Sequence, residues 1–167
     1  MPDALAIAAQ ALFYAGFAAA IGVFASWPTL PGLPDGTAQV KLSFSHSGAR
    51  AEECRRLSVE ELAKLPTSER RPTDCSRRRL PVSVQLTIDG NSFYEATLEP
   101  GGFSSDGPVK VYEKFVIPAG KHHIEARLRD SKREPGFDYN AAFDASLAPG
   151  QNLAIDFNAE LGGFLFR

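Results

Sequence analysis

The leading candidates for chemistry in this chain, by residue type and spacing, are its two cysteines. Cys54 and Cys75 are the only cysteines, and twenty residues separate them. In an oxidising compartment such a pair forms a disulfide that closes a loop, which contributes roughly 2–4 kcal/mol. The spacing is not the C-x-x-C of redox or metal sites, and in the cytoplasm both residues would be free thiols. We expect a structural disulfide if this segment lies outside the cytoplasm.

Arginines crowd the same segment. It carries nine basic and six acidic residues between Arg50 and Arg79. The clustered arginines are Arg55, Arg56, Arg70, Arg71, Arg77, Arg78 and Arg79. Because guanidinium groups pair in a bidentate manner with carboxylate or phosphate, the clusters fit a contact surface for an acidic partner or for anionic lipid headgroups. The alternative is a solvated face on which the arginines pair with glutamates of the same segment.

Catalytic and ligand-binding signatures do not emerge from the remaining polar residues. His122 and His123 are consecutive, so on a strand they face opposite sides and cannot bind one metal ion together. No serine lies in a G-x-S-x-G turn, and no acid, base and nucleophile converge. The formal net charge of −2 does not favour nucleic acid. We expect no enzyme, no metal or other cofactor, no nucleic-acid partner and no small-molecule substrate.

An apolar segment precedes all of these residues. Ala4 to Trp27 contains twenty-four residues without a charge, and about 20 apolar residues suffice for a membrane-spanning helix. A cleaved signal peptide would begin with basic residues and have a shorter apolar run, whereas a soluble core helix would have a polar face. We therefore expect residues 1–27 to be a retained transmembrane anchor in the bilayer. Neither flank carries Lys or Arg, so the orientation stays open, with a bacterial inner membrane and a periplasmic domain favoured over a cytoplasmic one.

The composition of this anchor suggests a helix partner. Ten of its residues are alanine, and Gly16 with Ala20 and Ala18 with Gly22 have the small-xxx-small spacing. Small residues let helices approach closely in a membrane, and the amide of Gln10 would gain from a partner on another helix. The alternative is that the alanines reflect only genome composition.

Residues 28–37, rich in proline and glycine, predict a stiff linker. Apolar and polar residues alternate after it, which is typical of half-buried strands. The predicted strands are 40–44, 82–88, 93–98, 109–117, 122–128, 139–145 and 153–157. About seven such strands predict a mainly β domain over residues 38–167, an antiparallel immunoglobulin-like β-sandwich.

The sandwich is interrupted by an insertion over residues 46–80 and ends in an apolar tail. Ser58 and Glu61 form an S-x-x-E capping box, which predicts a short helix that ends before Pro66. In the tail, Phe164 and Phe166 either belong to the edge of the last strand or dock into a partner by strand addition.

Three stretches of the second half have a shared strand-and-turn pattern. They are VQLTIDG at 84–90, VIPAGKHHIEARLRD at 116–130 and LAPGQNLAIDF at 147–157. This pattern resembles the bacterial PEGA-type β-sandwich modules and related envelope domains. The resemblance implies a binding or scaffolding unit of the cell envelope and transfers no site residue, because the shared motif is structural.

Together these features predict a single-pass accessory or assembly subunit. We expect it to bind a larger membrane protein complex through its helix, the arginine-rich insertion and the C-terminal tail. The alternative is a module that binds envelope glycan or peptide on an exposed sheet face. That function would need exposed aromatic side chains, for which Tyr94, Tyr112 and Phe137 are the candidates.

Overall fold

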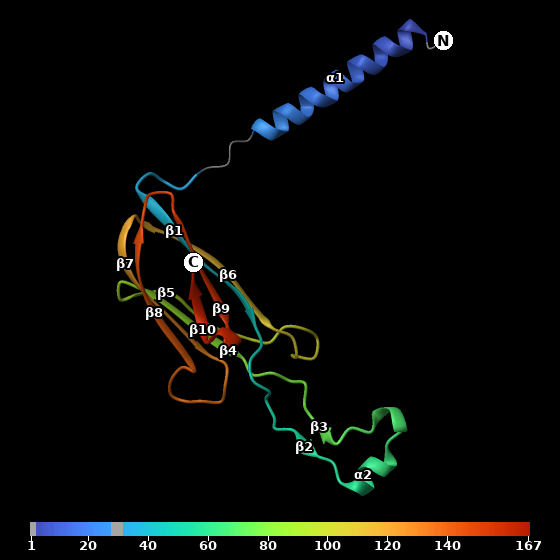
Figure 1. The fold of residues 1–167 in the computed structure, drawn as a ribbon, viewed down its shortest axis with the longest axis vertical. Coiled ribbons are helices and arrows are strands. Elements are labelled where there is room, and N and C mark those ends of the chain that lie inside the picture. The colour runs from blue at the N-terminus through green and yellow to red at the C-terminus, as the bar shows by residue number, and fades with distance from the viewer. Residues whose placement is uncertain (1–2, 28–31) are drawn as a thin grey trace. The chain divides into compact units, whose positions relative to one another are not determined.

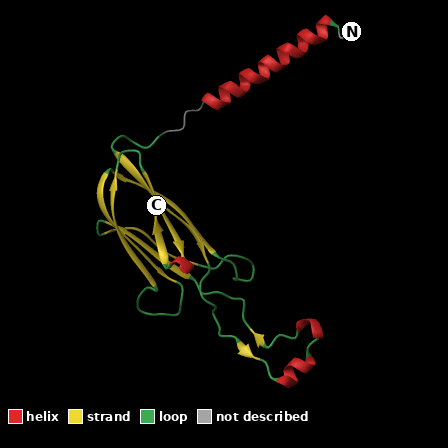
Figure 2. Cartoon of the chain, viewed as in Figure 1, coloured by secondary structure: helices red, strands yellow, loops and turns green. Residues whose placement is uncertain are grey.

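The structure, a computed structural model, describes residues 3–27 and 32–167. The chain forms two compact units, residues 1–32 and residues 33–167 (Figure 1). Most of the expected linker, residues 28–31, lies outside the described residues, whereas Leu33 to Gly36 belong to the second unit. The second unit is mainly β, as the alternating pattern predicted (Figure 2).

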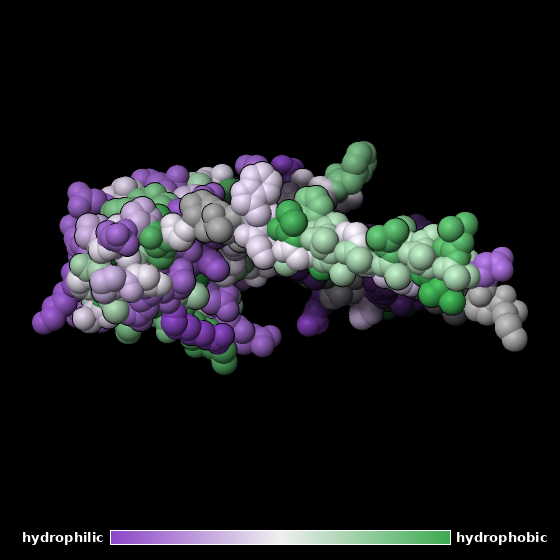
Figure 3. All heavy atoms as spheres, turned by 90° about the horizontal axis from the view of Figure 1, so that it is seen from above, coloured by the Kyte–Doolittle hydropathy of each residue, from purple (hydrophilic) through white to green (hydrophobic). Residues whose placement is uncertain are grey.

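The first unit contains a single helix, α1 (Ala4–Ser26). Its 23 residues would extend about 35 Å, enough to cross a bilayer. No side chain of α1 is buried, and apolar residues cover its visible surface (Figure 3). Trp27 closes the last turn through its N–H, which donates to the carbonyl oxygen of Val23 over 2.8 Å. The prediction of a candidate membrane-spanning helix is confirmed.

Eight strands of the second unit form two four-stranded sheets. Their bounds are β1 Thr37–His46, β4 Val82–Ile88, β5 Asn91–Leu98, β6 Val109–Pro118, β7 Gly120–Arg129, β8 Tyr139–Leu147, β9 Asn152–Asn158 and β10 Gly163–Phe166. One sheet has the order β10-β9-β1-β6 and the other the order β5-β4-β7-β8. All seven predicted strands are present, and β10 adds an eighth.

One strand pair departs from the expected antiparallel arrangement. β1 runs parallel to β9, with Val40 opposite Leu153, and the other pairs in both sheets are antiparallel. Parallel neighbours need a long connection, and here most of the domain lies between the two strands. The expectation of a purely antiparallel domain was therefore wrong at this pair.

The two sheets enclose one hydrophobic core, and we call the two sheets with this core the β domain. Alternate residues of β1, β4, β7 and β9 point inward, as the burial of β4 from Val82 to Ile88 illustrates. The largest fully buried side chains are Leu42, Leu86, Ile88, Ile124, Leu128 and Ile155. Burial of each such side chain stabilises the fold by roughly 1.5–3 kcal/mol. Aromatic pairs join the sheets at their margins, with ring centroids 5.0 Å apart for Phe143 and Phe166.

The hairpin between β4 and β5 shows how local sequence sets the register. Asp89 and Gly90 have φ of 51° and 79°, the left-handed conformation at both central turn residues that a two-residue hairpin requires. The side chain of Asp89 also accepts a hydrogen bond from the backbone N–H of His123, over 2.8 Å. The turn is thereby attached to the neighbouring strand β7.

Candidate functional site

The most distinctive part of the second unit is a long segment between β1 and β4, residues 47–81, which we call the arm (Figure 1). It contains β2 (Arg55–Arg56), α2 (Val59–Lys64), the 3-10 helix η1 (Thr67–Glu69) and β3 (Thr73–Asp74). From residue 49 to residue 80 no residue is buried. The arm therefore has no hydrophobic core of its own.

A disulfide holds the arm together. Cys54 and Cys75 are bonded, which confirms the predicted pair, and β2 and β3 form a short antiparallel ladder immediately inside it. In this ladder Arg55 lies opposite Asp74, next to the bonded cysteines. The crosslink replaces the packing energy that the arm cannot gain by burial.

The helix α2 begins as the capping box predicted. The backbone N–H of Glu61 donates to Ser58 Oγ over 3.3 Å, and the N–H of Ser58 donates to Glu61 Oε2 over 2.8 Å. The helix ends at Lys64, just before Pro66, as expected. Capping of this kind contributes about 1 kcal/mol, which helps a helix too short to be stable alone.

Backbone hydrogen bonds attach the base of the arm to the β domain. The N–H of Ala49 donates to Asp130 O, and the N–H of Leu80 donates to Ala49 O, both over 2.8 Å. A Cβ on Gly48 would lie 2.2 Å from the carbonyl oxygen of Leu80, so only glycine fits there. The base is thus held in one conformation where the arm leaves the sheet.

Four arginines make contacts inside the arm, and two of them brace its base. Arg50 Nη1 donates to the carbonyl oxygen of Ser76, and Arg79 Nη1 to that of Gly48, each over 3.1 Å. Both guanidinium groups therefore satisfy backbone carbonyls that the irregular chain leaves without strand partners.

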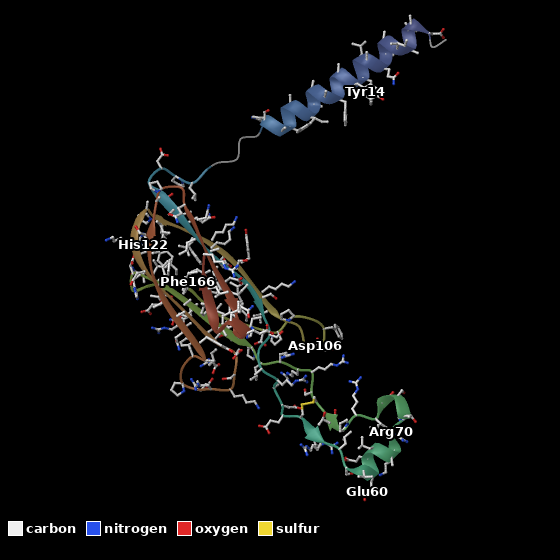
Figure 4. All side chains as sticks on the ribbon, in the orientation of Figure 1. Tyr14, Glu60, Arg70, Asp106, His122 and Phe166 are labelled. Atoms are coloured by element: carbon white, nitrogen blue, oxygen red, sulfur yellow. A yellow bond between two sulfur atoms is a disulfide. The ribbon has the colours of Figure 1, made fainter. Side chains whose placement is uncertain are left out.

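The other two contacts lie farther along the arm. Arg55 forms an exposed ion pair with Glu61, with 2.7 Å between Nη1 and Oε1. The bond raises the pKa of Arg55 and holds the pKa of Glu61 below its usual value. Arg70 Nε donates to the carbonyl oxygen of Leu65 over 3.1 Å (Figure 4 labels Arg70).

The remaining arginines of the arm make no hydrogen bond or ion pair with other residues that the structure describes. They are Arg56, Arg71, Arg77 and Arg78, and all four are exposed. The solvated-face alternative predicted several pairs with glutamates, yet Arg55–Glu61 is the one Arg–Glu pair found among the arm's described residues. Four guanidinium groups thus keep their bidentate donors available for a carboxylate or phosphate.

One of these arginines lines a hollow in the arm. The hollow has a volume of about 370 Å³, and its walls include Leu57 and Leu65 as well as Arg71. The Arg55–Glu61 pair closes another side. Glu69 and Asp74 also line the hollow, so its walls carry both acidic and basic groups and do not select a ligand of one charge.

All three histidines of the chain contact an aspartate. His46 Nε2 lies 2.6 Å from Asp130, His122 Nδ1 2.6 Å from Asp89, and His123 Nδ1 2.6 Å from Asp144. The three pairs lie at separate sites. Among the described residues, no group of three or more His, Cys, Asp or Glu side chains is arranged to hold a metal ion.

His122 is the most constrained of the three. Its Nε2 lies 2.8 Å from the carbonyl oxygen of Pro118, so both ring nitrogens face acceptors, and only the protonated ring can donate to both. The hydrogen bond to Asp89 raises the pKa of His122, and the same bond lowers the pKa of Asp89. The bond to Asp144 likewise raises the pKa of His123.

The C-terminal tail forms β10 and belongs to the core. β10 pairs with β9, and Phe164 is only 9% exposed, with its ring 5.1 Å from that of Phe157. Phe166 is half-buried and stacks on Phe143 (Figure 4). Of the two expectations for the tail, the edge-strand one holds. The placement of Phe164 on a partner surface was wrong, because its side chain is inside the domain.

The helix residues singled out for packing all lie on the exposed surface of α1. They are Gln10, Gly16, Ala18, Ala20 and Gly22. A Cβ built on Gly16 or Gly22 would meet nothing within 4 Å, so no described part of the chain covers these positions. The three aromatic residues considered for a glycan-binding face do not lie together on one sheet face. Tyr94 packs against the core, Tyr112 lies on an outer face between Lys41 and Lys114, and Phe137 is half-buried in a loop.

One exposed aromatic residue was missed in the sequence. Phe103 lies in the loop between β5 and β6, and its side chain is fully exposed. The available signal was a Gly-Gly-Phe turn flanked by Pro100 and Pro108, which marks a loop but does not reveal where the ring points.

Comparison with known proteins gives no relative from which a function could be transferred. No protein-family model, curated protein or solved structure matches the chain.

Proposed function

We propose that this protein is a single-pass accessory subunit that binds a larger membrane protein complex through α1 and the arm. In this proposal the β domain is an immunoglobulin-like sandwich that acts as the scaffold for the arm, akin to the PEGA-type modules of bacterial envelopes. No catalytic step is assigned to it.

The observation that carries the proposal is the arm itself. It buries no residue between positions 49 and 80, yet a disulfide, a capped helix and braced base residues keep it ordered. Such an element contributes little to the stability of the domain. The four exposed arginines without partners in the described structure give it the chemistry of a contact surface, and arginine is enriched at binding hot spots.

The disulfide also supports the side of the membrane on which the domain would lie. Bonded cysteines persist in oxidising compartments and are rare in the cytoplasm. We therefore favour an inner-membrane protein with N-terminus inside and the β domain in the periplasm. Labelling of a single engineered cysteine with a membrane-impermeant reagent in intact spheroplasts would contradict this orientation if the label failed to react.

The helix supplies the second contact. Small residues at four-residue spacing allow another helix to approach closely, and Gly16 and Gly22 have open space around them. Replacement of both glycines by leucine adds bulk at these positions without a clash inside the protein. The change therefore tests helix packing and leaves folding of the β domain intact.

The test is co-purification of the full chain in mild detergent, compared among matched variants. We expect Gly16→Leu with Gly22→Leu to abolish recovery of the partner. Ala6→Leu with Ala9→Leu, which lie outside the small-xxx-small pairs, should retain it.

A second set of variants tests the arm. Arg56→Glu with Arg71→Glu should weaken partner recovery, whereas Lys114→Glu with Lys121→Glu changes the net charge equally on exposed positions of β6 and β7 and should not. Retention of the partner by both the helix variant and the arm variant would overturn the proposal.

A further inference from the structure

A compact loop next to the base of the arm presents an aromatic side chain to solvent. This wedge loop, residues 99–108, connects β5 and β6 and contains Phe103, whose side chain is fully exposed (Figure 4 labels Asp106 in the same loop). The N–H of Gly107 donates to the carbonyl oxygen of Gly101 over 2.8 Å, which closes the loop. A single exposed apolar residue is ordinary on a protein surface, so the case depends on what surrounds it.

The wedge loop is ordered without any help from Phe103. A Cβ on Gly107 would lie 2.8 Å from the carbonyl oxygen of Gly101, so the loop packs more closely there than other residues allow. Gly102 and Ser105 adopt φ of 86° and 50°, the left-handed conformation that turns the chain sharply between them. Because the loop is already ordered, Phe103 can insert into an apolar environment outside the protein without further loss of backbone entropy.

Cationic residues stand beside this loop. The backbone N–H of Arg79 donates to the carbonyl oxygen of Ser105 over 2.9 Å, so the base of the arm is fastened to the wedge loop. Arg77 and Arg78 directly precede this contact, are exposed and have no partner among the described residues. The loop has two acidic residues. Glu99, at its start, is exposed, whereas Asp106 lies against the loop backbone, with Oδ1 3.2 Å from a Cβ built on Gly102.

From this juxtaposition we propose that the wedge loop is a second membrane contact. Phe103 enters the interfacial region of an anionic bilayer, and Arg77 and Arg78 bind the phosphates of lipid headgroups. An apolar side chain with flanking cations is the combination that holds peripheral segments at anionic membranes. This contact goes beyond the proposed function, because it requires lipid alone and no protein partner.

The chain itself argues for a bilayer as the occupant. The apolar helix α1 is long enough to keep the domain at a membrane, and the five residues between Trp27 and Leu33 can extend about 20 Å. The wedge loop lies at the other end of β1, since His46 pairs with Val109 at the end of the loop, and ten residues of strand span about 33 Å. The loop can therefore reach the surface to which the chain is anchored.

A second copy of the chain is a poorer occupant. A symmetric pair built on Phe103 would bring the arginines of one copy against those of the other, and like charges at an interface oppose association. An anionic lipid surface has the complementary charge instead.

The test uses the full chain in lipid nanodiscs with one protein per disc. Ser104→Cys, an exposed position beside Phe103, carries an environment-sensitive fluorophore, since the native cysteines are bonded and do not react. Discs contain either zwitterionic phospholipid or an equal mixture of zwitterionic and anionic phospholipid. Quenching by spin-labelled headgroups reports contact with the membrane, and Lys132→Cys, exposed in the loop before β8, is the control site.

We expect a blue-shifted, quenched signal at position 104 in anionic discs and a weak signal in zwitterionic discs. Phe103→Ser should remove the blue shift. Arg77→Glu with Arg78→Glu should lower the ratio of membrane-bound to unbound loop roughly 30-fold, from the loss of about two charge contacts. Equal signals at positions 104 and 132, equal signals in both lipids, or a blue shift that arises only when several copies share a disc would overturn the proposal. Unchanged thermal unfolding would establish that the variants remain folded.

Discussion

Removal of the disulfide should melt the arm while leaving the β domain intact. In the loop-closure model, a crosslink between residues separated by 21 positions contributes about 3 kcal/mol. Between the two cysteines, the interactions that remain are a two-residue ladder, one exposed ion pair, a few exposed hydrogen bonds such as that of Arg70 to Leu65, and a capping box of about 1 kcal/mol. Because no residue from 49 to 80 is buried, these interactions cannot hold the arm once Cys54→Ser and Cys75→Ser remove the bond.

The expected consequence differs between the two parts of the second unit. Amide exchange at Glu61 and Leu62, whose N–H groups donate to Ser58 in the native arm, should become as fast as in an unfolded chain. The thermal midpoint of the β domain should change by only a few degrees. By comparison, Leu42→Ala removes a fully buried side chain, costs about 2–5 kcal/mol and should lower the midpoint by roughly 10 °C.

Hydrogen exchange with calorimetry on the same samples separates these outcomes. Protected amides in α2 of the cysteine variant would show that the arm is stable without its crosslink. A midpoint that falls as far as that of Leu42→Ala would show that the arm and the β domain unfold as one unit. Either result would refute the view that the arm is ordered for contact and contributes little to stability.

Three further predictions concern the β domain. Raising the pH from about 6 to about 8 should lower the stability of the β domain, because the pKa of His122 is higher in the folded state than in the unfolded state. The resulting stabilisation is fully present at pH values below the unfolded-state pKa, and it is lost as the pH rises through the folded-state pKa and the ring deprotonates. The lowered pKa of Asp89 makes the pair fail again in acid, and His122→Gln should flatten both slopes in urea titrations. Gly48→Ala should cost about 1–3 kcal/mol from the clash with Leu80, measured by thermal unfolding. Phe164→Ala should lower the free energy of unfolding by about 3–5 kcal/mol, and an unchanged stability would show that this side chain is not part of the core.

Local patterns in the sequence were enough to predict much of the fold. The alternation of apolar residues located strands such as Val82–Ile88, because one face of each sheet must be buried. The capping box located α2 within two residues, since its hydrogen bonds involve only neighbours in the chain. The length and composition of the apolar segment were likewise sufficient for α1.

Features that depend on distant segments could not be predicted in this way. The parallel pairing of β1 with β9 joins strands from opposite ends of the domain, and four-residue β10 is too short to show a period. Whether arginines pair with glutamates depends on side-chain placement, and the structure leaves Arg56 and Arg71 without partners among its described residues. The outward direction of Phe103 follows from close backbone packing in its loop, which spacing does not encode.

The most direct test of the proposed function is the native mass of the protein after gentle extraction from its own membrane. A subunit that binds through α1 and the arm should leave the membrane in a complex of fixed stoichiometry with a larger membrane protein. The variant Gly16→Leu with Gly22→Leu should be released as a free chain of 18.1 kDa. Native mass spectrometry that finds the wild-type chain free, or the wild type and the variant in the same complex, would contradict the account.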